Sequence, residues 1–268
     1  MLKNITMGQY YPVDSWVHRL DPRIKILLTV AMIVAVFLVQ SIVGYALVLG
    51  FVYLTAYLAK VPFKMLMKGI KPLRFIIVLT FVLNLFFFTD GTPIIAWQFI
   101  RITDAGLTQA FHYSLRLIFL VIGTSLLTLT TSPIALSDGI ERLFAPLKRF
   151  HFPAHELAMM MSIALRFIPT LMEEADKIMK AQMARGADFE SGGLVQRAKA
   201  LIPLLVPLFI SSFRRADELA VAMECRCYHG GEGRTRLRQL QYQGIDRAAL
   251  AFFLLLTVAV GVLGRFGL

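Results

Sequence analysis

An internal repeat pairs the segment AQMARG, from Ala181 to Gly186, with the segment AMECRC, from Ala222 to Cys227. Both follow the pattern Ala-x-x-[Ala/Cys]-Arg-[Gly/Cys], and in both the arginine falls nine residues after an aspartate that is preceded by alanine. The repeat indicates that this part of the chain contains two similar structural units, each ending at an arginine.

Each copy is expected to end a helix. The residues before each arginine lack Gly and Pro, and their apolar positions recur at spacings of three and four. A cation is favoured at a helix C-terminus, and Gly186 can adopt the left-handed conformation that ends a helix. We therefore expect Arg185 and Arg226 to form two matched cationic tips, although a solvated capping arginine is the simpler interpretation of either one alone.

The composition is that of a membrane protein. The chain has 268 residues, of which 57% are apolar, and its mean hydropathy is +0.67. The first apolar run begins at Ile24 and residues 1–11 have no apolar core, so we expect no cleavable signal peptide. The net charge of +11 is better explained by lysines and arginines beside membrane spans than by nucleic-acid binding.

Five membrane spans are expected. Asp21-Pro22 is a helix start, because Asp can accept main-chain hydrogen bonds and Pro suits the first helical position. The apolar stretch from Ile24 to Ala59 would form a helix of roughly 54 Å, too long for one span of about 30 Å, so two spans with a tight turn fit better. The expected spans are 24–39, 45–59, 73–88, 106–131 and 248–266.

The charges between the spans set the expected topology. Five cations without an acid follow the second span, which predicts a cytoplasmic loop: Lys60, Lys64, Lys68, Lys71 and Arg74. Residues 89–105 then form an outside loop. The fourth span carries Arg116, which is either a functional group or a structural charge that reaches the headgroups or a neighbouring span.

From Ser132 to Arg247 the chain changes character, with 16 Lys/Arg and 13 Asp/Glu against 12 and 4 in the rest. This pattern predicts three helices outside the membrane, from Ser132-Pro133 to Arg149, from Pro153 to Arg185, and from Gly193 to Arg226. The expected domains are 1–131 with four spans, 132–247 in the cytoplasm, and 248–268 with the last span.

One alternative would separate the two arginine tips. Residues 157–172 and 201–213 are apolar, and if both crossed the bilayer Arg185 and Arg226 would lie on opposite sides. Arg166 would then lie inside a span, which costs several kcal/mol unless the charge is paired. Since thirteen apolar residues are too few to cross, we place both segments against the membrane surface or each other.

We find no catalytic constellation in the sequence. Cys225, Cys227 and His229 have no second ligand cluster, so we interpret them as residues of a helix end and expect no metal site. The spans contain no Asp or Glu, and of the polar residues that could line a path only Asn84, His112 and Arg116 stand well inside a span. An autonomous channel or secondary transporter is therefore the weaker alternative.

The combined pattern resembles the transmembrane, or T, component of energy-coupling factor (ECF) vitamin transporters. The similarity rests on HRLDPR at residues 18–23, TTSP at 130–133, ALRFIP at 164–169 and the two arginine repeats. It implies an all-α polytopic membrane protein with about five transmembrane helices and a three-helix cytoplasmic coupling domain inserted before the last span.

The resemblance also implies partners and site residues. The two repeats would end coupling helices that dock on two ATP-binding-cassette ATPases, a heterodimer that binds ATP and Mg, so this chain would be non-catalytic and hold no cofactor. The implied docking residues are Ala184, Arg185, Gly186, Cys225, Arg226 and Cys227, of which the second set lacks the usual glycine. A substrate-binding membrane (S) component would complete the complex, either an interchangeable vitamin unit or, alternatively, a dedicated cobalt, nickel or biotin unit. The location would be the bacterial cell membrane, with the N-terminus inside and the C-terminus outside.

Overall fold

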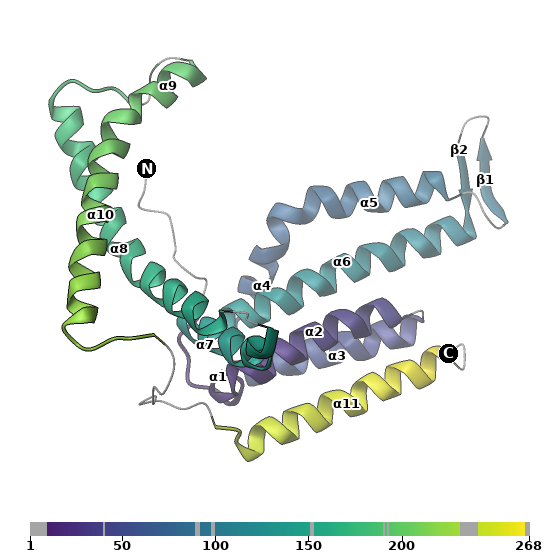
Figure 1. Cartoon of the computed structure of the whole chain (residues 1–268). Helices are drawn as coiled ribbons and strands as arrows, with labels where there is room; N and C mark the ends of the chain where they lie inside the picture. Colours follow the sequence, from purple (N-terminus) through teal and green to yellow (C-terminus); the bar gives the residue numbers. More distant parts are fainter. Residues whose placement is uncertain are drawn as a thin grey trace. The chain divides into compact units, whose positions relative to one another are not determined.

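The chain is an all-α polytopic membrane protein with one small β-hairpin (Figure 1). The computed structural model describes residues 10–39, 41–88, 92–97, 100–150, 153–189, 191, 193–230 and 241–265. These residues fall into two compact units, one of residues 10–139 and 241–265 and one of residues 140–230. The boundary between them lies within a single helix, after Gly139.

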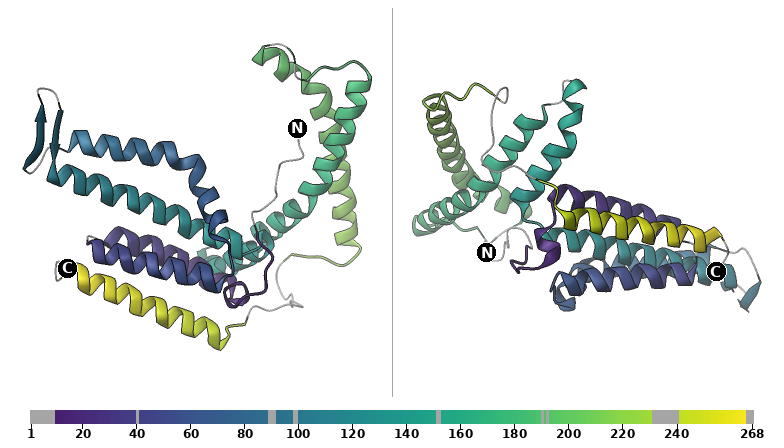
Figure 2. Two further views of the ribbon diagram at one scale, coloured as in Figure 1. Left: turned by 180° about the vertical axis from the view of Figure 1, so that it is seen from behind. Right: turned by 90° about the horizontal axis from the view of Figure 1, so that it is seen from below.

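The first unit holds a helix at each of the five expected spans. These helices are α2 (Pro22–Leu38), α3 (Ile42–Leu58), α5 (Arg74–Phe87), α6 (Asp104–Thr130) and α11 (Gly244–Arg265). They lie side by side, with α5 beside α6, and α11 beside α2 and α3 (Figures 1 and 2). The shorter elements of the unit are α1 (Trp16–Arg19), α4 (Phe63–Ile70), η2 (Lys71–Leu73), β1 (Pro93–Trp97), β2 (Ile100–Thr103) and the first part of α7 (Pro133–Phe144).

Local caps explain where these helices begin. The Asp21 carboxylate accepts the Arg23 N–H and Pro22 takes the first position of α2, which confirms the start expected there. Ser41 and Thr103 accept main-chain N–H groups in the same way at the starts of α3 and α6. Each cap satisfies a donor that the helix itself leaves without a partner.

Helix α6 is central to the packing of the first unit. It contacts α2, α3, α4 and α5. Close approach is permitted by glycines, since a Cβ on Gly106 would lie 2.7 Å from the Phe88 carbonyl oxygen and one on Gly69 of α4 would lie 2.6 Å from Ser125 Oγ of α6. The buried core is apolar and comes from α2, α3, α4, α6, α11 and the residues that follow α2 and α3: Met32, Ala35, Val36, Val39, Tyr45, Val48, Val52, Ala56, Ala59, Val61, Leu66, Phe119, Ile122, Leu126, Leu129 and Phe253.

Two segments expected to be loops contain regular structure. Within the basic stretch after the second span, residues 63–70 form α4, and within the expected outside loop β1 and β2 pair antiparallel.

Length and apolar composition suffice for a membrane span in three stretches of the described chain. These are Phe63–Phe87, Asp104–Thr130 and Val195–Glu224, with Ile42–Leu58 as a shorter apolar helix. The third stretch includes residues 201–213, which we expected to be too short to cross. With its flanking residues the stretch reaches spanning length, which the apolar segment alone does not.

The second unit is built on two long helices. It contains the end of α7, η3 (Ala145–Phe150), α8 (Ala154–Ala184), α9 (Leu194–Ala200) and α10 (Ile202–Glu224). Helix α8 runs through Pro169 without interruption, whereas the third expected helix is divided at Leu201 into α9 and α10. Helices α8 and α10 pack against each other and run in opposite directions (Figures 1 and 2).

Candidate functional site: two arginine helix ends

The end of α8 forms a compact capped turn. The N–H groups of Arg185 and Ala187 both donate to the Gln182 carbonyl, at 3.0 Å, and the Gly186 N–H donates to Met183 O, also at 3.0 Å. Gly186 has a φ of +88°, in the left-handed region. This is the Schellman arrangement, in which a residue without a Cβ reverses the chain and satisfies the last helix carbonyls.

The end of α10 repeats this turn bond for bond. The N–H groups of Arg226 and Tyr228 both donate to the Met223 carbonyl, at 3.1 Å, and the Cys227 N–H donates to Glu224 O at 2.9 Å. Cys227 therefore takes the place of Gly186, and its φ of +54° lies in the same left-handed region. The lack of a glycine changes the strain at this position but not the geometry of the helix end.

Both arginines stand free at these turns. All six residues proposed for docking are exposed: Ala184, Arg185, Gly186, Cys225, Arg226 and Cys227. Within the described part of the chain, the side chains of Arg185 and Arg226 make no hydrogen bond or ion pair. A planar guanidinium in this state keeps five donors available for carboxylates or carbonyls of another protein.

The crossing of α8 and α10 fixes where the two tips lie. Glu174 of α8 accepts hydrogen bonds from the Ser211 hydroxyl and, at 2.6 Å, from Arg215 Nη2 of α10. Arg185 follows Glu174 by eleven residues and Arg226 follows Arg215 by eleven residues. At 1.5 Å per residue each tip is about 17 Å from the crossing, and because the helices are antiparallel the tips lie at opposite ends of the pair, on the order of 30 Å apart. This separation suits one partner at each tip.

Glu174 joins the two helices of the site but was not singled out from the sequence. The Ser211 hydroxyl first, and the Arg215 guanidinium next, hold the pKa of Glu174 below its ordinary value of 4.5, because both stabilise the ionised form. The sequence did contain a signal for this contact, since Glu174 and Arg215 occupy equivalent positions in the two copies of the repeat.

The Arg116 side chain contacts the C-terminal end of the neighbouring helix α2. Its Nη2 donates to Phe37 O of α2 at 3.3 Å, and its guanidinium lies 5.0 Å from the Phe37 ring centre. The Phe37 carbonyl is near the C-terminus of α2, where a cation is favoured. Arg116 also lines a cavity of about 720 Å³ with His112 and Tyr113. These contacts fit the structural alternative for this charge.

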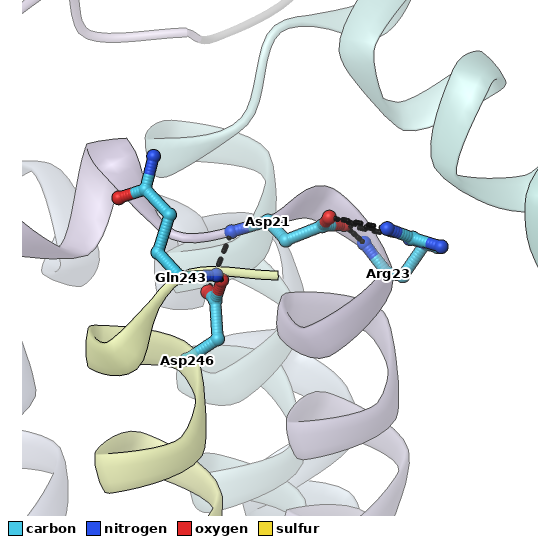
Figure 3. A network of polar contacts seen from close by, with 4 residues as sticks. All are labelled: Asp21, Arg23, Gln243 and Asp246. Atoms are coloured by element: carbon cyan, nitrogen blue, oxygen red, sulfur yellow. Dashed lines mark hydrogen bonds and ion pairs between the residues drawn. The ribbon is translucent and has the colours of Figure 1, made fainter. Parts of the chain in front are cut away.

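A second polar cluster joins α2 to α11 (Figure 3). The buried Asp246 carboxylate accepts the Asp21 N–H at 2.9 Å and the Gln243 N–H at 2.7 Å, while the Asp21 carboxylate binds Arg23 through Nε and Nη2. Lys25 Nζ in turn donates to Thr130 O at 2.9 Å, at the end of α6. Asp21 and Lys25, at the start of α2, therefore link α2 to α11 and to α6 at one end of the first unit.

The other polar residues singled out from the sequence make local contacts. Asn84 Nδ2 donates to Thr80 O of its own helix at 2.8 Å, and the His112 ring packs 5.3 Å from the Tyr45 ring. Cys225 and Cys227 are free and exposed, and no three His, Cys, Asp or Glu side chains gather as metal ligands in the described ranges.

Comparison with known proteins identifies close relatives over nearly the full length. Residues 14–237 match the model of the CbiQ family, described as cobalt transport protein. The "Energy-coupling factor transporter transmembrane protein EcfT" of Clostridium kluyveri is 55% identical over 267 residues, 99% of this chain and 98% of the relative. Proteins with the same name from Thermosediminibacter oceani and Bacillus subtilis are 58% identical over 265 residues and 51% identical over 263 residues, covering 99% and 95% of this chain and 99% of each relative.

Proposed function

Since the chain belongs to the CbiQ family and is a transmembrane (T) subunit of an energy-coupling factor transporter, we propose that it is the non-catalytic scaffold that links two ATPases to a substrate-binding S component. Closure of the ATPase pair would move the two arginine tips, and the rigid α8–α10 pair would pass this movement to the membrane unit and the S component, driving vitamin uptake. ATP and Mg would be bound by the ATPases.

The observation that carries the proposal is the duplicated helix end. Two helices terminate in the same hydrogen-bonded turn, each with an exposed arginine without a partner in the described chain. The tips are equally far from the Glu174–Arg215 contact. A symmetric pair of anchors suits a pair of similar ATPases, one at each tip, and buried interfacial arginines often contribute 2 kcal/mol or more to binding.

We place the N-terminus and the unit of residues 140–230 in the cytoplasm and the C-terminus outside, in a bacterial cell membrane. The cations from Lys60 to Arg74 support this orientation. The charges of α10 support the same placement, since Arg214 and Arg215 directly follow the apolar segment and Arg215 pairs with Glu174 of α8. An ion pair between two amphipathic helices is typical of packing outside the hydrocarbon core.

A second candidate is a subunit dedicated to one substrate unit, for cobalt, nickel or biotin. The description of the family model favours cobalt, whereas the relatives named above carry the general energy-coupling factor name. Mass spectrometry of S components that co-purify with the native chain distinguishes the two, since a shared scaffold yields several and a dedicated one yields one. An autonomous transporter is disfavoured, because it would need polar groups that line a path. Asn84 and Arg116 instead donate hydrogen bonds to main-chain carbonyls.

Co-purification of the ATPases tests the docking role. We expect Arg185→Ala or Arg226→Ala to weaken ATPase binding about 30-fold each, and the double variant to abolish it. Arg197→Ala, in exposed α9, is the matched control and should bind normally. Full, salt-resistant ATPase binding by a folded double variant would overturn the proposal.

A further inference from the structure

Helix α4 carries two adjacent stripes on its outward face. Phe63 and Met67 are 54% and 44% exposed, although both are large apolar side chains. Lys64 and Lys68 of α4 and Lys71 at the start of η2 follow one another at spacings of four and three residues, so they form one exposed row beside the apolar pair. This is the pattern of a helix that lies in a membrane interface.

The opposite face of α4 is fixed to the rest of the first unit. Leu66 is fully buried, and Met65 and Ile70 pack against the core. Gly69 lies so close to α6 that an added Cβ would approach Ser125 Oγ to 2.6 Å. The outward face of α4 therefore cannot turn inward without breaking this packing.

The contact with Ser125 also sets the depth of α4. Helix α6 has 27 residues and is about 40 Å long, so roughly 5 Å at each end extends beyond a hydrocarbon core of about 30 Å. Ser125 is five residues, or about 7.5 Å, from the end of α6 at Thr130. Helix α4 therefore lies at the boundary between hydrocarbon and headgroups.

The cations of this region lack acidic partners. No Asp or Glu occurs from Lys60 to Arg74. Among the residues that the structure describes, none forms an ion pair with Lys64, Lys68 or Lys71. A row of unpaired cations at headgroup depth is complementary to the phosphodiester of an anionic lipid.

We propose that α4 binds anionic phospholipids, with Phe63 and Met67 in the acyl-chain region and Lys64, Lys68 and Lys71 on the headgroup phosphates. Because α4 packs on α6 and leads through η2 into α5, bound lipid holds these three helices together. Anionic lipid is therefore a ligand that stabilises the membrane unit.

Thermal unfolding of the purified full-length chain in detergent tests this proposal. Phosphatidylglycerol and phosphatidylcholine are titrated in parallel, and the preference for phosphatidylglycerol is the ratio of the two apparent affinities. The variant Lys64→Gln/Lys68→Gln/Lys71→Gln should reduce this preference on the order of 100-fold, from about 1 kcal/mol per lysine. Lys177→Gln/Lys180→Gln/Lys199→Gln, with the same change in charge on α8 and α9, should keep it, and the corresponding triple arginine variant at 64, 68 and 71 should restore it.

A second measurement locates the lipid. In a chain with Trp16 and Trp97 replaced by Phe, a Phe63→Trp reporter should be quenched more strongly by brominated phosphatidylglycerol than by brominated phosphatidylcholine. Equal responses to the two lipids, or an unchanged preference in the folded glutamine variant, would overturn the proposal. So would loss of ATPase co-purification by that variant with its lipid preference intact, since this face of α4 would then be a protein interface.

Discussion

Arg215 donates a hydrogen bond of 2.6 Å to Glu174, and these two residues occupy the same position in the two copies of the internal repeat. The copies therefore cross antiparallel at equivalent points, and an approximate two-fold axis relates the α8 end at Arg185 to the α10 end at Arg226. Removing this contact should affect how the two tips are held relative to each other.

A double-mutant cycle on Glu174→Gln and Arg215→Ala should give a coupling free energy of about 0.5–1 kcal/mol, because both side chains are partly exposed. Urea unfolding of the chain in micelles measures it, and a coupling of zero would mean that the crossing does not depend on this pair.

The stability of the fold should also decrease at acidic pH, because Glu174 becomes protonated there. Because the folded pKa of Glu174 is lowered, its contribution is fully present above the ordinary value of 4.5 and is lost as the pH falls through the lowered folded value. Thermal unfolding midpoints between pH 6 and pH 3 (roughly the range that brackets these values) should decline less for Glu174→Gln than for the parent chain. Glu173→Gln, one residue away and exposed, is the control, and an equal decline in all three chains would refute this assignment.

The two capped turns should respond in opposite directions to substitution. Gly186→Ala places a Cβ in the left-handed region without a clash and should destabilise the α8 end by about 1–2 kcal/mol. Cys227→Gly relieves strain and should be neutral or stabilising by up to about 1 kcal/mol, since glycine also gains freedom in the unfolded chain. Amide hydrogen exchange at Ala187 and Tyr228 measures both, and faster exchange at Tyr228 in Cys227→Gly would contradict the assignment.

Gly106 should tolerate no side chain. Its Cβ would lie 2.7 Å from the Phe88 carbonyl oxygen, a main-chain atom that cannot rotate away, so Gly106→Ala should destabilise the first unit by about 1–3 kcal/mol. Gly50→Ala in α3 meets nothing within 4 Å and should be neutral or stabilising by up to about 1 kcal/mol through helix propensity. Thermal unfolding of the two variants provides the comparison. Equal unfolding midpoints would show that α5 and α6 can move apart with little loss of stability.

Asp246 should be a major determinant of how α11 is held. Asp246→Ala leaves the buried N–H group of Asp21 and the partly buried N–H group of Gln243 without an acceptor, and it should destabilise the chain by about 2–4 kcal/mol. Asp14→Ala, which removes an exposed pair with Arg19, should leave the unfolding midpoint nearly unchanged, because exposed ion pairs contribute little to stability. Similar unfolding midpoints for the two variants would show that the α2–α11 junction holds without this carboxylate.

The sequence predicted features that short-range chemistry determines. The helix start at Asp21-Pro22 and the left-handed Gly186 follow from local caps, and the structure has both. The five expected spans coincide with helices because hydrophobic runs of that length leave few other structures in a bilayer.

Features that depend on distant residues were not predictable in this way. Asp246 accepts from a residue 225 positions earlier, and Cys227 adopts a conformation that cysteine by itself disfavours. In the stretch after Lys60, the positive charge predicted the side of the membrane but concealed α4, whose apolar face is defined only by packing on α6. The separation of Arg185 and Arg226 likewise follows from the antiparallel crossing, which the repeat did not reveal.

Site-specific cross-linking tests the central claim most directly. In the assembled complex, with Cys225 and Cys227 replaced by Ser, a photo-cross-linker is attached to Arg185→Cys or to Arg226→Cys. We predict that each position cross-links to one ATPase subunit and that the two positions reach different subunits. Cross-links from both positions to the same ATPase, or labelling of either position from outside intact cells, would contradict the account.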